Sequence, residues 1–487
     1  MTRPNILLFM SDNQPADLLG CYGNDEVKTP HLDEIAARGA RFDQAYCVNA
    51  MCSPCRASAL TGLMPSQHGI HNWLDDKLMD KWPNNWSAIG EFNTIPSIVK
   101  QAGYATALIG KFHLGVPFIP QLAFDHWVTF PHGHTTSFYG NEVIDQEERY
   151  RFTGHTVDFF TDKTIEFLEH QSRQEEPFFA FVPYNGPYGH WPAIKGRAEN
   201  EFAELYDDAD MHSIPREGLN DTVLERFGIR VSQGGLREQF KGPLLLPNNV
   251  ESLRNYFSQV SLIDHGIGRT MAALERLNLR RDTLVIYTSD HGFSLGHNGI
   301  WGHGAAGFPA SAHRASYHIP LLMSGGFADG AGAISDLVSQ IDLFPTLANL
   351  VGSDAQPSLP SAAQDLAKVA NHSYPNWRDA VFVEQEETRA IRSDRWLYAQ
   401  RFKGAAAYPM EDELYDLHED PLEKNNLIHV EEYASVCAEL RGRIDAYFGQ
   451  YSTPEFDLWN GGTAKSNVTF EGLWKDAWGD DWQPKFS

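Results

Sequence analysis

The sequence is poor in cysteine, in positive charge and in long apolar runs. Its 487 residues include five irregularly spaced cysteines, too few for a disulfide framework. Lys and Arg number 39 against 64 Asp and Glu, which gives a formal charge of -25 and excludes a general attraction to nucleic acid or to an anionic membrane. No apolar run approaches the ~20 residues that span a bilayer. The opening MTRPNILLFMSDN has no signal-peptide cleavage site, so we expect a cytoplasmic protein.

Four short apolar runs stop abruptly at polar clusters. NILLFM ends at Ser11–Asn13, ATALI at Gly110–His113 and TLVIYT at Ser289–Gly292, while PFFAFV leads into PYNGPYGHWP, which contains His190. These runs do not alternate and are rich in β-branched and aromatic residues, as strands buried on both faces are. Ligands of parallel sheets bind beyond the carboxyl ends of the strands, so we expect the polar clusters to converge on one edge.

Helical patterns lie between these runs. In TPHLDEIAARGARF, Thr29 is a suitable N-cap, Pro30 occupies the first helical position and Gly39 can end the helix. A longer amphipathic pattern, SLRNYFSQVSLIDHGIGRTMAALERLNL, predicts a helix bent near Gly266 or Gly268. Strands that alternate with helices predict an α/β fold with a doubly wound, mostly parallel sheet.

The composition shifts to Pro, Ser and Ala around VGSDAQPSLPSAAQD, as in a linker or a surface loop. Beyond it, AVFVEQEETRAIRSDRWLYAQRF has the pattern of hairpin strands, and a terminal helix is expected from about Val430 to Phe448. We therefore predict a catalytic domain over residues 1–360. Residues 361–487 are predicted to form a smaller α+β subdomain with an antiparallel sheet and the terminal helix.

Cys52 and Cys55 form a C-x-x-C pair that allows several interpretations. A redox dithiol is typical of a small βαβ domain, which no other feature supports, and a zinc site needs a second ligand pair, which the other cysteines do not supply. Two inert buried thiols are a further interpretation, since cysteine is often a small apolar core residue. In the last interpretation only Cys52 is reactive, and the residues that follow it favour this one.

Those residues, Cys52-Ser53-Pro54-Cys55-Arg56 followed by Leu60-Thr61-Gly62, resemble the signature C-x-P-x-R and L-T-G of the sulfatase family. SDNQPADLLGCYGN, GYATALIGKFHLG, TSDHGFSLGHNG and ELYDLHEDPLEKNNL are also similar to sulfatase segments. The resemblance implies an alkaline-phosphatase-like α/β fold with a smaller C-terminal domain. It also implies that a formylglycine-generating maturation enzyme converts Cys52 to formylglycine, whose hydrated aldehyde is the nucleophile. Cys55 then occupies a position that is usually serine.

The local sequence is consistent with that role for Cys52. Pro54 suits the first turn of a helix that runs to Gly62, which places Cys52 at the helix N-terminus. Unpaired backbone N–H groups and the helix dipole favour anions there, and a sulfate group is one. Arg56, one turn further on, could reach back to the oxygen of the nucleophile as a fixed positive charge.

The resemblance also implies a metal site. Asp12, Asn13, Asp290 and His291 match the metal ligands of the family, and the modified Cys52 completes the set. Oxygen ligands suit Ca²⁺. Asn13 replaces the second acid of the common Asp-Asp pair and His291 occupies a position often held by Asn, so Mn²⁺ is an alternative.

Four further residues are assigned by the same resemblance. Lys111 and His113 match the K-x-H pair that contacts the sulfate and the nucleophile, and His190 matches the histidine that could protonate the leaving alcohol. His303 stands in a segment where the family usually has lysine. Since the charge of histidine depends on pH, we expect an activity optimum at neutral or mildly acidic pH.

We therefore expect a sulfuric ester hydrolase that acts on a small-molecule or saccharide sulfate ester. The implied mechanism is attack of the formylglycine hydrate on sulfur, followed by elimination of sulfate, which an ordinary serine or cysteine could not achieve. A phosphonate monoester or phosphodiester hydrolase on the same fold is the alternative, and Lys111 with His113 favours the sulfatase. A third hypothesis is a binding protein in which Cys52 remains a thiol.

Overall fold

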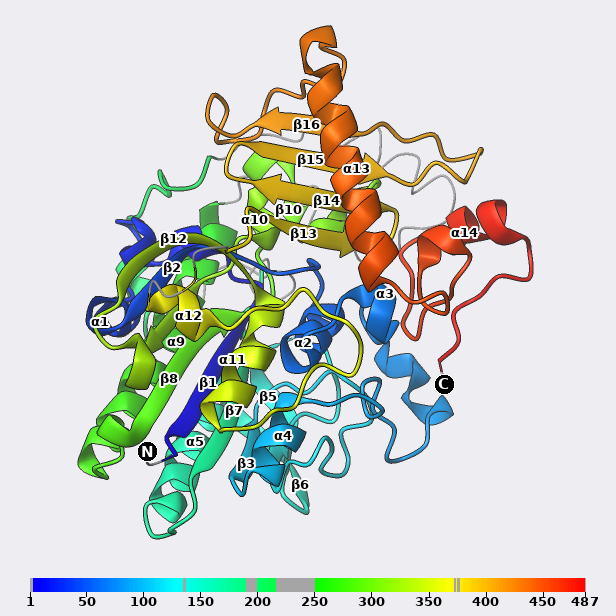
Figure 1. Ribbon diagram of the computed structural model, residues 1–487. Helices are drawn as coiled ribbons and strands as arrows, with labels where there is room; N and C mark the ends of the chain where they lie inside the picture. The colour runs from blue at the N-terminus through cyan, green and yellow to red at the C-terminus, as the bar shows by residue number, and fades with distance from the viewer. Residues whose placement is uncertain are drawn as a thin grey trace.

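A ten-stranded sheet forms the centre of the computed structural model, which describes residues 3–134, 137–189, 199–215, 250–371, 374 and 377–486. Figure 1 shows this sheet below a smaller four-stranded sheet. From edge to edge, the large sheet contains β12 (Gly332–Ser339), β2 (Ala40–Tyr46), β11 (Leu321–Ser324), β8 (Thr283–Ser289), β1 (Asn5–Asp12), β7 (Phe178–Pro187), β3 (Ala105–Ile109), β4 (His126–Thr129), β5 (Tyr139–Asp145) and β6 (Glu148–His155).

The central strands run parallel, and the outer ones make the sheet mixed. β8, β1, β7, β3 and β4 are parallel neighbours, whereas β11 lies antiparallel to both β8 and β2. β5 and β6 add an antiparallel hairpin at one edge. Every residue of β1, β7 and β8 is buried, which explains why these runs do not alternate. The prediction of a mostly parallel sheet is confirmed for its centre.

Successive residues of β1 pack into two separate cores, one on each face of the sheet. Leu8 belongs to the core that includes α2 (Cys52–Thr61), α4 (Ile95–Gln101) and α11 (Leu343–Leu350). Leu7 and Phe9 belong to the core that includes α1 (Pro30–Arg38), α5 (Thr156–Gln171) and α9 (Val250–Arg276). Helices therefore cover both faces, and the predicted doubly wound α/β architecture is confirmed (Figure 1).

The two helices predicted from their patterns are present. α1 follows Thr29 with proline at its first position, and Gly39 is its C-terminal cap. α9 continues without interruption through both glycines at which a bend was expected. The bend stays a prediction, and the glycines permit close packing, because a Cβ at Gly268 would lie 2.4 Å from the His31 ring.

The second sheet is antiparallel and carries its own helix. Its strands are β13 (Ala380–Gln385), β14 (Thr388–Ser393), β15 (Trp396–Arg401) and β16 (Glu413–Asp416), and α13 (Ala434–Tyr451) packs on it through Leu440, Ile444 and Phe448. These elements agree with the predicted hairpins and terminal helix, and the domain boundary at residue 360 stays a prediction. The chain continues into a further helix, α14 (Glu471–Trp478), that the sequence did not predict.

The remaining α-helices and strands of the described part of the chain are short. They are α3 (Pro65–His68), β9 (Ser294–Leu295), β10 (Trp301–Gly302), α10 (Arg314–Tyr317) and α12 (Leu366–Ala370). None of the helices that the structure describes has both the length and the apolar content needed to cross a membrane.

A buried ion-pair network joins the four-stranded sheet to the C-terminal segment. The Arg389 guanidinium on β14 lies 2.7 Å from the Glu384 carboxylate on β13 and 2.7 Å from the Asp457 carboxylate. All three residues are less than 10% exposed, and Glu384 also accepts a hydrogen bond from the Ser66 N–H on α3. Arg389 therefore compensates two buried negative charges at once.

Replacing Arg389 with alanine is expected to lower the free energy of unfolding by about 3–5 kcal/mol, because two carboxylates are left buried without their cation. Arg443→Ala is the control, since Arg443 pairs with the exposed Asp379 at the surface and its loss should cost no more than about 1 kcal/mol. Chemical denaturation of both variants measures the difference. Equal losses would contradict the structural role of the network.

Candidate active site

The ends of β1 and β8 bring two carboxylates together at one edge of the sheet. Ser11 pairs with Ser289 in the parallel register, so Asp12 and Asp290 follow at equivalent positions. The Asp290 N–H donates to the Ser11 carbonyl at 3.0 Å, and the Asn13 N–H donates to the Asp290 carboxylate at 3.2 Å. The predicted convergence is confirmed for these two strands.

Four candidate metal ligands cluster at this edge. One ligand atom each from Asp12, Cys52, Asp290 and His291 lies within 4.8 Å of the others, and all four residues are buried. The Cys52 sulfur lies 3.6 Å from Asp12 Oδ1 and 3.5 Å from His291 Nε2. His291 Nδ1 lies 2.7 Å from the Gly292 carbonyl, which can only accept, so Nδ1 donates there and Nε2 faces Cys52.

The amide of Asn13 indicates that a cation fits here. Asn13 adopts a positive φ of 65° directly after β1, and its side chain is fully buried. Neither its Oδ1 nor its Nδ2 has a hydrogen-bond partner among the described residues. Buried amides are normally satisfied, and a cation bound to Oδ1 would account for that unpartnered acceptor. Together with two carboxylates and an imidazole nitrogen, this set fits a divalent metal ion.

Two buried cations balance the carboxylates. Arg56 Nη2 lies 3.0 Å from Asp12 Oδ2 and 2.9 Å from Asp290 Oδ2, while Nη1 donates to the Lys111 carbonyl at 2.6 Å. Lys111 Nζ lies 2.6 Å from Asp12 Oδ2. Burial opposes ionisation of Asp12, but Lys111 and Arg56 outweigh it and hold the pKa of its carboxyl below the usual value. Two of the cations of this acidic chain are thus buried at this point, each against a carboxylate.

Cys52 begins α2, and its thiol is buried. Burial, reinforced by the Asp12 carboxylate, raises the pKa of the Cys52 thiol. Cys55, one turn further along, points elsewhere and donates to the Asn49 carbonyl at 2.6 Å. All five cysteines are free thiols, and Cys55 joins none of the potential metal clusters of the described residues. The structure therefore favours distinct roles for the two cysteines of the C-x-x-C pair.

His113 follows β3 with one ring nitrogen engaged. Its Nε2 lies 3.0 Å from the Leu74 carbonyl, and its buried Nδ1 has no hydrogen-bond partner within the described ranges. Burial and the nearby charge of Lys111 hold the pKa of His113 well below its usual value, so the ring is neutral. Nε2 donates to the carbonyl, and Nδ1 is left as an acceptor.

Of the other two histidines predicted for the site, His303 is described by the structure and His190 is not. His303 lies close to the cluster, with its ring centroid 5.4 Å from that of His291 and nearly perpendicular to it. His190 lies outside the described residues. Gly189, directly before it, accepts a hydrogen bond from the Trp301 indole at 3.1 Å, so the chain at the end of β7 is tied to the hairpin near His303.

Sequence reasoning missed three residues near the site. Tyr188 donates its N–H to the Asp12 carbonyl at 3.1 Å, and its ring centroid lies 5.2 Å from Lys111 Nζ. Asp76 and His134 form a cluster with His113 in which one ligand atom of each lies within 4.8 Å of the others. They belong to loops rich in Trp, His and Asn, and the composition of these loops was the signal that could have found them.

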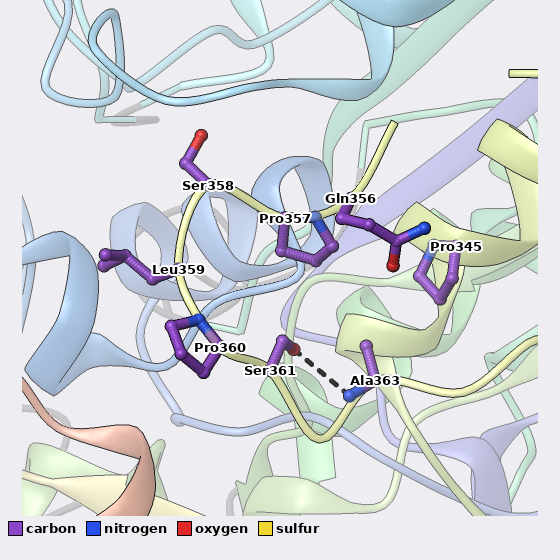
Figure 2. Close-up of a pocket in the computed structure, with 8 residues that line it drawn as sticks. All are labelled: Pro345, Gln356, Pro357, Ser358, Leu359, Pro360, Ser361 and Ala363. Atoms are coloured by element: carbon purple, nitrogen blue, oxygen red, sulfur yellow. Dashed lines mark hydrogen bonds between the residues drawn. The ribbon is translucent and has the colours of Figure 1, made fainter. Parts of the chain in front are cut away.

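A cavity of about 300 Å³ lies at the opposite end of α2 and is not part of this cluster (Figure 2). Its wall is the segment Gln356–Ser361 with Pro345 and Ala363. A Cβ at Gly62, which caps the C-terminus of α2, would contact Pro357. The ten residues of α2 span about 15 Å, so Cys52 and this cavity are at opposite ends of the helix.

Comparison with known families gives the identity of the chain. The sulfatase model matches residues 4–353, and a model of the C-terminal region of N-sulphoglucosamine sulphohydrolase matches residues 311–449. The chain belongs to the sulfatase family. It is a sulfuric ester hydrolase, as the signature around Cys52 predicted.

Curated relatives of this sulfatase are similar over most of its length. An N-acetylglucosamine-6-O-sulfatase of Bacteroides thetaiotaomicron is 28% identical, over 96% of this chain and 89% of the relative. Iduronate 2-sulfatase of Homo sapiens is 28% identical, over 73% of this chain and 70% of the relative. A choline-sulfatase of Rhizobium meliloti is 27% identical, over 87% of this chain and 82% of the relative.

Solved structures share the fold. One, in complex with its substrate D-glucosamine-2-N,6-O-disulfate, superposes with a TM-score of 0.72 at 23% identity and covers 92% of this chain and 98% of the other. The phosphonate monoester hydrolase of Agrobacterium radiobacter superposes with a TM-score of 0.70 at 20% identity and covers 92% of this chain and 96% of the other. The predicted alkaline-phosphatase-like fold is confirmed.

Asp12→Asn and Asp290→Asn are each expected to weaken divalent-cation binding by about 100-fold or more, since each removes an anionic oxygen from the cluster. In metal sites generally, even the loss of a group that only contacts a ligand weakens metal binding by about 10- to 100-fold. Titration calorimetry with Ca²⁺ and, separately, Mn²⁺ measures the affinities. Asp282→Asn is the matched control, because Asp282 is exposed just before β8, at the end of that strand away from the site. Affinities unchanged in both cluster variants would exclude a metal at this edge.

Proposed function

We propose that the sulfatase hydrolyses sulfate esters of carbohydrates, with a formylglycine formed from Cys52 and a divalent cation held beside it. The observation that carries the proposal is the buried cluster of Asp12, Cys52, Asp290 and His291, with Arg56 and Lys111 against it. The printed names of its relatives, a sulfatase of N-acetylglucosamine and one of iduronate, support a saccharide substrate.

Asp12, Asn13, Asp290 and His291 are the residues that would hold the cation. Ca²⁺ is proposed because most of these donors are oxygens, and Mn²⁺ is the alternative because His291 supplies a nitrogen. When bound, the cation supplies positive charge that favours ionisation of a hydroxyl at position 52 and stabilises charge on the sulfuryl oxygens.

Conversion of Cys52 to formylglycine resolves the problem posed by its thiol. The raised pKa of the buried thiol leaves it protonated, so the unmodified residue is a poor nucleophile. The hydrated aldehyde supplies two hydroxyls on one carbon, one for attack on sulfur and one whose ionisation expels sulfate. The N-terminus of α2 supplies backbone N–H groups that favour an anion beside the residue.

The remaining residues receive roles from their surroundings. Lys111 is held among buried groups at the end of β3, where a fixed positive charge favours the transferred sulfuryl group. Arg56 favours ionisation of Asp12 and holds Asp12 and Asp290 in place through its shared guanidinium. His113 takes a proton through Nδ1, its free acceptor. His190 and His303 are proposed to protonate the leaving alcohol.

Hydrolysis of phosphonate monoesters or phosphodiesters is the alternative, and the fold shared with a phosphonate monoester hydrolase favours it. The pair Lys111 and His113 favours sulfate, because it matches the sulfate-contacting pair of the sulfatases. A binding protein with an unmodified Cys52 is the remaining hypothesis. The next two experiments distinguish the three functions, which are hydrolysis of sulfate esters, hydrolysis of phosphonate monoesters or phosphodiesters, and binding without hydrolysis.

Co-expression with a formylglycine-generating enzyme is expected to remove the sulfur from the peptide that contains Cys52, as peptide mass spectrometry detects. Activity should appear only in the converted sample, and Cys52→Ala should abolish it, because no group at position 52 can then attack sulfur. Cys55→Ser is the control and should keep both folding and turnover. A converted, folded and metal-loaded protein without activity would exclude the proposal.

N-acetylglucosamine 6-sulfate is expected to be hydrolysed with a kcat/KM at least about 100-fold above that of the matching 6-phosphate, a difference of about 2.7 kcal/mol in transition-state stabilisation. Released sulfate and phosphate are quantified by ion chromatography. An aryl sulfate tests the leaving group separately. A preference for the phosphate or for a phosphonate monoester would establish the alternative function.

A further inference from the structure

Two loops that are distant in sequence meet at His113. The first follows α3 and contains Leu74 and Asp76, which begins a short 3-10 helix ending at Lys81. The second follows β4 and contains Gly133 and His134. Both contact the ring of His113 or lie directly beside it. The mechanism given above uses His113 but assigns no role to these loops.

Leu74 connects His113 to the helix that carries Cys52. The Leu74 N–H donates to the Ser53 hydroxyl on α2 at 3.1 Å, and the Leu74 carbonyl accepts from His113 Nε2 at 3.0 Å. One backbone residue thus fixes the imidazole relative to the first turn of α2. Because a carbonyl only accepts, this contact also decides which ring nitrogen carries the proton.

Gly133 closes off the space on another side of the imidazole. A Cβ built on Gly133 would lie 2.0 Å from His113 Cδ2 and 2.5 Å from Nε2. The backbone of the second loop therefore lies directly against the ring, and every other residue at position 133 would displace it. The His134 ring packs beside the His113 ring, and the two ring centroids lie 5.0 Å apart with an angle of 67° between the ring planes.

Asp76 fastens the second loop in this position. Its Oδ1 accepts from the Gly133 N–H at 2.7 Å, and its Oδ2 accepts from the His134 N–H at 3.3 Å. The same Oδ2 lies 3.1 Å from His134 Nδ1. Burial opposes ionisation of Asp76, but its hydrogen bond with His134 leads the effects that hold its pKa below the usual value. A single carboxylate therefore satisfies three donors of one loop.

We propose that Asp76 is a positioning residue for sulfate ester hydrolysis. By holding Gly133 and His134 against the ring of His113, it keeps Nε2 on the Leu74 carbonyl and Nδ1 available to take a proton. The inference rests on the proposed function, in which His113 accepts a proton through Nδ1. Asp76 acts through His113, so its effect disappears when His113 is absent.

Steady-state kinetics of Asp76→Ala test the proposal. We expect kcat to fall about 10- to 100-fold with little change in KM, since displacing a reacting group by about 1 Å costs up to 100-fold. Asp76→Asn should recover part of kcat, because its amide oxygen can still accept from the Gly133 N–H, whereas its NH₂ group cannot accept from the two His134 donors. Asp80→Asn, an exposed residue of the same 3-10 helix, is the matched control. An unchanged kcat in Asp76→Ala would overturn the proposal.

A double-mutant cycle distinguishes positioning from direct contact with the substrate. Asp76→Ala should cause no further loss in a His113→Ala background, whereas equal losses in both backgrounds would overturn the proposal. Gly133→Ala should lower kcat as Asp76→Ala does, because its Cβ displaces the ring. Gly442→Ala on α13 is its control, since a Cβ there meets nothing within 4 Å. Unchanged turnover in Gly133→Ala would also count against the proposal.

Crystal structures of Asp76→Ala and Gly133→Ala provide a test that does not depend on turnover. Movement of the His113 ring away from the Leu74 carbonyl supports the proposal, and a ring that stays in place in both variants overturns it. Together with the activity of His113→Ala, this test separates the proposed role of His113 in hydrolysis from the proposed positioning by Asp76. Full activity in His113→Ala would exclude its proposed role in hydrolysis, whereas an unmoved ring excludes only the positioning by Asp76.

Discussion

The structure depends on a balance of four buried charges at the end of the central sheet. Asp12 and Asp290 are compensated by Arg56 and Lys111, and none of the four is more than 1% exposed. Removing one partner from such a cluster leaves a buried charge that costs about 3–5 kcal/mol. The parallel register of β1 with β8 and the placement of α2 across their ends therefore determine both stability and chemistry. A cation added to the cluster enters a site whose ligands are already held in position.

The four-stranded sheet contributes to this site indirectly. At the end of β13, the Glu384 N–H donates to the Val48 carbonyl at 2.8 Å, and the Glu384 carbonyl accepts from the Asn49 amide at 2.6 Å. The Gln385 side chain accepts from the Ala50 N–H at 3.1 Å. These contacts fix the three residues that precede Met51 and Cys52. The second sheet thus holds the segment that leads into Cys52 and α2, and each of these contacts uses at least one backbone group, which leaves little trace in the sequence.

Much of the cluster could be predicted because it lies at the ends of buried strands. Asp12, Lys111 and Asp290 each follow an apolar run, and parallel strands bring their carboxyl ends to one edge. Asp76 and His134 could not be predicted in this way, because loops 58 residues apart meet through backbone N–H groups and a glycine contact. The antiparallel insertion of β11 was missed for a similar reason, since a short buried strand has the same composition in either direction. The close packing at the glycines of α9 was not predicted, because packing and bending favour the same residue.

The chain carries a net charge of -25, whereas the four charged groups buried at the site balance one another, and this difference affects how an anionic ester is recognised. A net charge of -25 repels anions at long range, but at physiological ionic strength that field is screened beyond about 8 Å. Buried groups are screened far less, so Lys111 and the first turn of α2 act on an anion only once it reaches the site. Binding then depends on contact geometry rather than on steering.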